Sequence, residues 1–181
     1  MKIFLRLATL TVSFAAVPVV AFETAYLHFA SPADWQCNLR LGVWECRAED
    51  PQGPRSGIFM AAVMAEAPGR PTGVPSMVEF VDFRMKEFFR LEPLKRLSDK
   101  TLESTDVAGI SWKRRNLERE SGTATYATEI LSTKVRDADG SVKLDIYVWH
   151  SRAPGAENDT TDEWSSVVQS LRLQPRFTAA R

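Results

Sequence analysis

The chain has 181 residues, and its 23 Lys or Arg balance 23 Asp or Glu, so its formal net charge is zero. This balance excludes a strongly basic nucleic-acid-binding protein and an acidic solvating chain. Two Cys and two His are too few for a Cys-rich scaffold or for most zinc-binding frameworks. The length predicts one globular domain, which we place at residues 22–175, followed by a frayed tail at residues 176–181.

Residues 1–21 are typical of a secretory signal peptide. Lys2 and Arg6 make a positive start, an apolar run follows, and Ala21 is a small residue at the expected cleavage position. An uncleaved membrane anchor is the alternative, but the run is shorter than the ~20 apolar residues of a spanning helix. We therefore expect cleavage after Ala21 and a periplasmic or secreted protein that does not span a membrane.

Cys37 and Cys46 are the only cysteines, and their spacing predicts a disulfide-bonded hairpin. A two-residue turn at Leu41-Gly42 places Cys37 opposite Cys46 on neighbouring strands. Outside the cytoplasm such a pair forms a disulfide. A redox-active pair is the alternative, which the spacing disfavours because it is not Cys-x-x-Cys. In the chain-entropy description, so small a loop stabilises the fold by ~3 kcal/mol.

The first half of the mature chain predicts two further strands and a helix. Residues 25–30 alternate in polarity and form a strand. Residues 58–65 are apolar throughout, which fits a short helix or a strand covered on both faces, and the flanking Pro and Gly favour the strand. Ser76–Glu79 has the pattern of a capping box, so we expect a helix that begins there and ends before Pro93. Residues 94–105 give no clear prediction.

The second half predicts three strands, at residues 107–117, 123–136 and 142–150. Asp139-Gly140 is a hairpin signal between the last two. This turn predicts the cross-strand pairs Val135 with Leu144, Thr133 with Ile146, Leu131 with Val148, Lys134 with Asp145 and Arg136 with Lys143.

A second helix closes the domain. Thr160–Glu163 has the pattern of another capping box. The apolar residues that follow are spaced for a helix with one buried face: Trp164, Val167, Val168 and Leu171.

This order of elements resembles the PsbP-like fold, the family of the extrinsic photosystem protein PsbP and its bacterial relatives. The similarity lies in Phe29–Trp35, which matches an aromatic-x-x-Pro-x-x-Trp start, in residues 58–65, in Ile146–Val148 and in Val167–Leu171. It implies an α+β fold, with two main helices packed on an antiparallel β-sheet as an α/β sandwich. It also implies an assembly or stabilising role without catalytic residues. The Cys37–Cys46 hairpin departs from the family pattern.

Three functions remain open. The leading one is an exported, monomeric, non-catalytic binding or assembly module of the bacterial cell envelope, without a cofactor, whose partner is an envelope protein or glycan. The alternative is a small envelope hydrolase that uses His28 or His150, the only side chains that titrate near neutral pH without tuning. Gly-x-Ser-x-Gly, His-Glu-x-x-His and nucleotide-binding glycine motifs are absent from the sequence. The third possibility is a purely structural subunit.

Tyr147 and Trp149 are the candidate binding surface. In the predicted hairpin both side chains point away from the apolar face, where an exposed Tyr–Trp strip binds a glycan, a peptide or a protein. The alternative is that a helix covers this face and makes the strip a second core. Lys113-Arg114-Arg115 is the densest basic run. It fits a phosphate or anionic-lipid surface, but we favour an edge strand protected by charge.

Overall fold

The computed structural model describes residues 19–24, 26–32, 34–40, 43–49, 56–65, 76–140 and 143–179. Most of the predicted signal peptide and the predicted Leu41-Gly42 turn lie outside these residues. Within them, no helix is long and apolar enough to cross a membrane.

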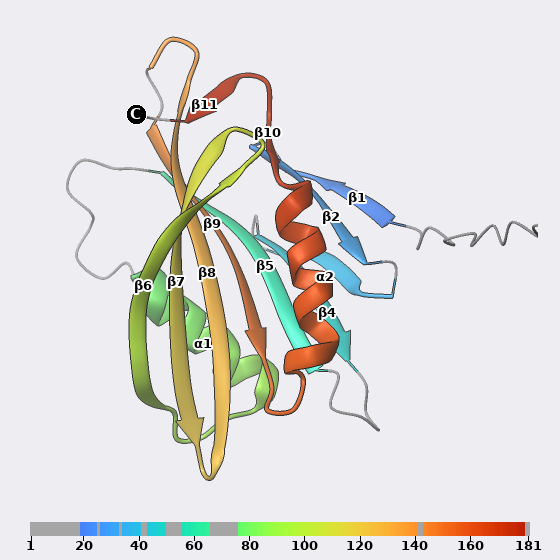
Figure 1. The fold of residues 1–181 in the computed structure, drawn as a ribbon, viewed down its shortest axis with the longest axis vertical. Helices are drawn as coiled ribbons and strands as arrows, with labels where there is room; N and C mark the ends of the chain where they lie inside the picture. Colours follow the sequence, from blue (N-terminus) through green and yellow to red (C-terminus); the bar gives the residue numbers. More distant parts are fainter. Residues whose placement is uncertain are drawn as a thin grey trace, which may run out of the picture.

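The fold is built on a large, entirely antiparallel sheet with the strand order β3-β4-β5-β9-β8-β7-β6 (Figure 1). Its strands are β3 (Gln36–Arg40), β4 (Val43–Glu49), β5 (Ser56–Ala65), β6 (Lys95–Val107), β7 (Ile110–Ser121), β8 (Ala124–Asp137) and β9 (Lys143–Arg152), and β11 (Phe177–Ala179) pairs with the end of β8. The apolar β5 lies between β4 and β9, so the prediction of an interior strand at residues 58–65 is confirmed.

A second, three-stranded sheet joins the two ends of the described chain. It consists of β1 (Val19–Glu23), β2 (Leu27–Pro32) and β10 (Arg172–Leu173), with β2 in the middle. The rings of Phe22 and Phe29 stack with centroids 5.4 Å apart, and Phe22 also contacts Trp44 of β4 at 4.8 Å. These rings attach the small sheet to the large one.

Two helices cover opposite faces of the large sheet. Helix α1 (Met77–Phe89) begins with the predicted capping box: Glu79 N–H donates to Ser76 Oγ at 3.2 Å, and Ser76 N–H donates to the Glu79 carboxylate at 2.5 Å. It ends at Arg90, which takes the left-handed conformation with φ of 55°. Helix α2 (Glu157–Ser170) lies on the other face beside the small sheet.

The two faces have separate apolar cores. The α2 face holds the larger one, which includes Trp35, Cys46, Trp112, Ile146, Val148, Trp164, Val167 and Leu171. The α1 face holds the smaller one, made of Met77, Val78, Val81, Met85, Leu117, Ile130 and Trp149. The apolar stripe predicted for the second helix is therefore confirmed. An α+β fold with an antiparallel sheet and two main helices is confirmed as well.

Both predicted hairpin registers are confirmed. Cys37 pairs with Cys46 in the β3–β4 hairpin, and the two form a disulfide. The β8–β9 pairs are those expected from a turn at Asp139-Gly140, from Leu131 opposite Val148 to Arg136 opposite Lys143. Register was predictable here because a slip by one residue would turn each apolar set toward the opposite face.

The second capping box, predicted at Thr160–Glu163, is wrong. Helix α2 begins earlier, at Glu157, and its N-cap Ala156 makes no side-chain hydrogen bond. Gly155, with φ of 82°, turns the chain sharply and directs the fully buried Ala156 into the core. Burial of Ala156 at this turn, rather than a capping side chain, therefore sets the start of the helix.

Two other segments differ from the sequence prediction. Residues 94–105, which gave no clear prediction, lie in β6 at one edge of the sheet. The expected tail contains β11, where Phe177 is buried and its ring lies 5.3 Å from that of Tyr26. Pairing with β8 and burial of the Phe177 ring, both with partners far away in sequence, thus order the segment that we expected to fray.

Candidate functional site

Helix α1 decides the role of Trp149. The Trp149 side chain is fully buried, and its ring meets Phe80 of α1 edge-to-face with centroids 5.9 Å apart. Trp149 therefore belongs to a second core beneath a helix, which was the alternative interpretation of the sequence. The expectation that Trp149 belongs to an exposed binding strip is wrong, because α1 lies across that part of the strand.

Tyr147 lies where helix α1 stops covering the sheet, and its side chain is only half-buried. Residues paired across neighbouring strands share a face, so Lys113, Ser132 and Tyr147 form one row, and Arg115, Ile130 and Trp149 form the next. Ser132 and Tyr147 are half-buried, and Lys113 is exposed. The first turn of α1 thus ends near the boundary between the two rows.

A pocket of about 240 Å³ lies at this boundary. Its lining comes from the start of α1 and from strands β7, β8 and β9: Ser76, Met77, Val78, Arg115, Ile130, Ser132 and Tyr147. Its described walls are the capped start of α1 and three interior strands. We call it the α1 pocket.

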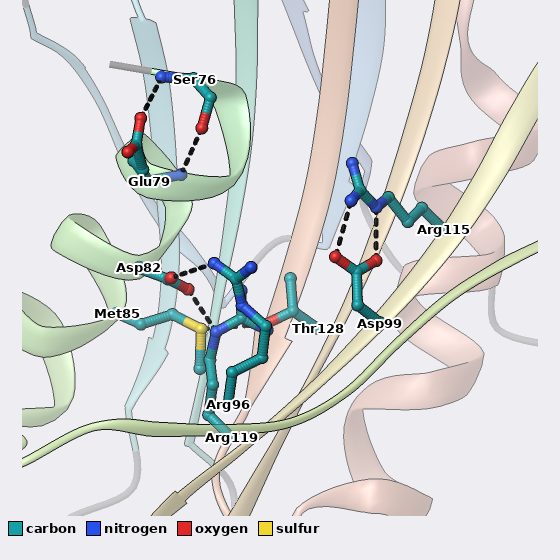
Figure 2. A network of polar contacts seen from close by, with 9 residues as sticks. All are labelled: Ser76, Glu79, Asp82, Met85, Arg96, Asp99, Arg115, Arg119 and Thr128. Atoms are coloured by element: carbon teal, nitrogen blue, oxygen red, sulfur yellow. Dashed lines mark hydrogen bonds and ion pairs between the residues drawn. The ribbon is translucent and has the colours of Figure 1, made fainter.

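Arg115 is the charged group of the α1 pocket, and Asp99 of β6 holds it in place. Arg115 Nε and Nη2 each donate to the Asp99 carboxylate at 2.6 Å (Figure 2). This hydrogen-bonded pair lowers the pKa of Asp99 and raises the pKa of Arg115. The nearby Tyr147 also helps to raise the pKa of Arg115. The guanidinium is therefore fully charged and fixed in orientation at neutral pH.

A wider charge cluster continues from Arg115 under α1. Asp82 of α1 accepts hydrogen bonds from Arg96, at 3.1 Å, and from Arg119 (Figure 2). Arg119 is fully buried, and this burial lowers its pKa. With Asp99 and Arg115, the cluster holds three arginines and two aspartates, so it carries one net positive charge.

The basic run does not protect an edge strand. Its strand, β7, pairs with both β6 and β8 and is therefore an interior strand, which corrects our preferred interpretation. Arg114 and Arg115 point to opposite faces, and each pairs with one acid: Arg114 with Glu129 at 3.1 Å, and Arg115 with Asp99. Asp99 was missed because it belongs to the segment that gave no clear prediction.

The two histidines lie in unlike surroundings. His150 is buried on the α2 face, where its ring stacks on Trp164 at 5.4 Å and lies 5.9 Å from Trp35. Burial, with a smaller contribution from Arg152, lowers its pKa to about 3. His28 is partly exposed, and its Nε2 is 4.0 Å from a Glu23 carboxylate oxygen. His150 is thus a neutral residue of the core without access to a substrate.

Metal binding also finds no support in the described part of the chain. Among the described residues, no three His, Cys, Asp or Glu side chains are grouped so that they could hold a metal ion.

No family model matches the chain, and no curated protein sequence matches it. Among solved structures the fold is similar to LpqN of Mycobacterium tuberculosis, which is involved in cell envelope biogenesis; the TM-score is 0.56 with 10% identity, and the match covers 87% of this chain and 91% of LpqN. PsbP of the cyanobacterium Synechocystis matches at a TM-score of 0.47 and 10% identity, covering 92% and 98%. The predicted resemblance to PsbP-like proteins is thus confirmed as a weak similarity of fold.

Proposed function

We propose that this protein is an exported, non-catalytic binding or assembly module of the bacterial cell envelope, and that the α1 pocket is its binding site. The observation that carries the proposal is the pocket itself. It combines an apolar floor with a guanidinium paired to Asp99 and with three hydroxyl groups, which is the composition of a recognition site. Among the described residues, its lining includes no histidine, cysteine or carboxylate that would serve as a base or a nucleophile.

Two features support a location in the periplasm or outside the cell. Residues 1–21 have the pattern of a cleaved leader, and cleavage after Ala21 would leave Phe22 and Glu23 of β1 on the processed chain. The Cys37–Cys46 disulfide is stable in oxidising compartments and rare in the cytoplasm. The role of LpqN in cell envelope biogenesis is consistent with this location and supports the envelope as the place of action.

The hydrolase alternative has less support. His150 is buried between two tryptophan rings, and its low pKa makes it a weak base. His28 is accessible, but its nearest charged neighbour, Glu23, lies at 4.0 Å on an exposed strand. Neither histidine lines the α1 pocket.

The experiment compares two variants that each add one tryptophan to β8. Ser132→Trp fills the α1 pocket, whereas Thr125→Trp adds the same side chain at an exposed position of the same strand. Each processed protein serves as bait for envelope extract from the producing cell, after thermal melts have shown that it is folded. We expect Ser132→Trp to lose a component that the wild type and Thr125→Trp both retain.

Equal capture by all three proteins would contradict the α1 pocket as the binding site. Hydrolysis of a simple ester that disappears in a folded His28→Ala variant would favour the enzyme instead. N-terminal sequencing of the exported protein tests the leader: we expect a start at Phe22 or within a residue or two, whereas an intact Met1 on a membrane-bound form would contradict export by cleavage.

A further inference from the structure

The chemistry of the α1 pocket narrows the class of its ligand. The floor and one wall are apolar, formed by the buried residues Met77, Val78 and Ile130. The polar groups are concentrated on the sheet, where Ser132 and Tyr147 supply hydroxyls and Arg115 supplies a cation. A ligand that fits both parts has an apolar body with a polar group at one end.

The charge around the pocket favours an anion at that end. Asp99 engages Nε and Nη2 of Arg115, which leaves the third guanidinium nitrogen, Nη1, for another acceptor. The exposed Lys113 lies directly opposite Ser132 on the same face of the sheet and adds a second positive charge. Arg96, Arg119, Arg115 and Lys113 thus supply four positive charges, against the three carboxylates of Asp82, Asp99 and Glu79.

The end of helix α1 is not the main anchor for this anion. The capping box already uses the Ser76 hydroxyl and places the Glu79 carboxylate against the first turn. That carboxylate offsets much of the positive end of the helix dipole. The guanidinium of Arg115, fixed by Asp99, is therefore the group that discriminates between charged and neutral ligands.

We propose that the α1 pocket binds a small molecule with one oxyanion, a carboxylate or a phosphate monoester, attached to a compact apolar or aromatic body. The oxyanion pairs with Arg115 and Lys113 and accepts hydrogen bonds from Ser132 and Tyr147. The apolar body lies on Met77, Val78 and Ile130. This proposal rests on the proposed function, because it names the ligand of the same site.

The test uses four small probes that share one ring: benzoate, phenyl phosphate, benzyl alcohol and benzylamine. Each is titrated into the processed, ¹⁵N-labelled protein while the amide shifts of Ser132 and Tyr147 are followed by NMR. We expect saturable shifts with the two anions and binding at least roughly tenfold weaker with the alcohol and the amine, because charge-assisted hydrogen bonds need the anion. The two anions distinguish a carboxylate ligand from a phosphate ligand.

Arg115→Gln and Arg114→Gln are the matched pair of variants. Each removes one positive charge and one ion pair from β7, but only Arg115 lines the pocket. We expect Arg115→Gln to weaken binding of the tighter-binding anion, benzoate or phenyl phosphate, roughly tenfold or more. Arg114→Gln should change the affinity for the same anion less than about twofold. Ser132→Ala, which alters no charge, should weaken binding by a smaller factor.

Three results would overturn the proposal: no saturable binding of either anion, equal binding of benzyl alcohol, or equal losses in both arginine variants. If Arg115→Gln does not fold, Arg115→Lys replaces it, and an unchanged affinity then contradicts the role of the guanidinium fork. These results remain distinguishable from failure of the proposed function. If the natural ligand is neutral, the anion probes will not bind, but Ser132→Trp will still lose the envelope component that the wild type captures.

Discussion

At the scale of single residues, His150 makes the stability of the fold sensitive to acid. Its pKa is about 3 in the folded protein, against an ordinary value of 6.5. Between these values the unfolded chain binds a proton that the folded chain does not, so stability is complete above pH 6.5 and falls as the pH approaches 3. The full shift corresponds to ~4–5 kcal/mol.

We therefore expect His150→Phe, which keeps a ring between Trp35 and Trp164, to lose most of this pH dependence. Urea unfolding at several pH values between 7.5 and 4 measures it, with His28→Phe as the control. The interpretation fails if His150→Phe and wild type lose the same free energy of unfolding over that range.

Arg119 provides a second residue-scale prediction. Its Nη1 and Nη2 have no hydrogen-bond partner among the described residues, although the side chain is fully buried. Arg119→Leu removes this desolvated charge and leaves Asp82 paired with Arg96, so we expect its stability to lie within ~1 kcal/mol of wild type. Asp82→Ala leaves Arg119 buried without its carboxylate and should cost ~3 kcal/mol.

Denaturant unfolding of both variants under the same conditions makes this comparison. Arg119 does not line the α1 pocket but supplies one charge of the cluster under α1, so Arg119→Leu should weaken binding of the anion probes by less than Arg115→Gln does. A larger loss in Arg119→Leu than in Asp82→Ala would mean that the guanidinium has a stabilising partner we have not identified.

At the scale of elements, helix α1 is held by an apolar stripe and by ion pairs at its sides. Arg84 of α1 pairs with the buried Glu45 of β4 and with Glu87, while Asp82 pairs with Arg119 of β7. Trp149 lies beneath the helix between these contacts and is the largest buried side chain of the smaller core.

We expect Trp149→Ala to open a cavity under α1 and to cost ~3–5 kcal/mol. Tyr147→Phe, one row away, keeps the ring and should lower the melting temperature much less than Trp149→Ala does. A thermal melt of the two variants suffices, and a Trp149→Ala protein with wild-type stability would contradict the packing of α1 on this residue.

Sequence predicted the elements whose signals are local. The Ser76–Glu79 capping box, the Asp139-Gly140 turn and the cysteine spacing each specify geometry within a few residues. The start of α2, the pairing of β11 and the position of Asp99 depend on partners far away in sequence, so no local pattern marks them. The candidate site could be predicted only in part for the same reason. Tyr147 and Arg115 were singled out, whereas their meeting at the end of α1 is a consequence of tertiary packing.

At the scale of the whole molecule, β6 is one of the two edge strands of the large sheet, and most of its residues are exposed. In an antiparallel pairing of two β6 strands about a two-fold axis, residues opposite each other lie on the same face. The regular segment Ser98–Leu102 then allows registers centred on Asp99 or Lys100, and each places like charges opposite one another. Bulges next to Arg96 and Leu102 also bend this edge. Both features protect an edge strand from self-association.

We therefore expect a monomer in solution, which light scattering across a range of protein concentrations measures. Lys100→Val removes one of the protecting charges from β6 without touching the Asp99–Arg115 pair, so it should increase self-association. Lys113→Val, on the interior strand β7, is the control that should not. A stable wild-type dimer would show that the charged edge fails to prevent pairing.

Under the proposed export, the small sheet has a consequence for the order in which the domain forms. Its middle strand pairs His28 with Arg172 and Leu27 with Leu173, and the Gln174 side chain also bonds to Glu23 and Thr24. A chain that crosses a membrane with its N-terminus first therefore carries its earliest strands across long before their partner arrives. Until then the rings of Phe22 and Phe29 lack their full cover, and contacts of such long sequence separation form late. The small sheet becomes complete only when the last ten or so residues have emerged. A chain truncated before β10 would therefore lose order first in β1 and β2, at its N-terminal end.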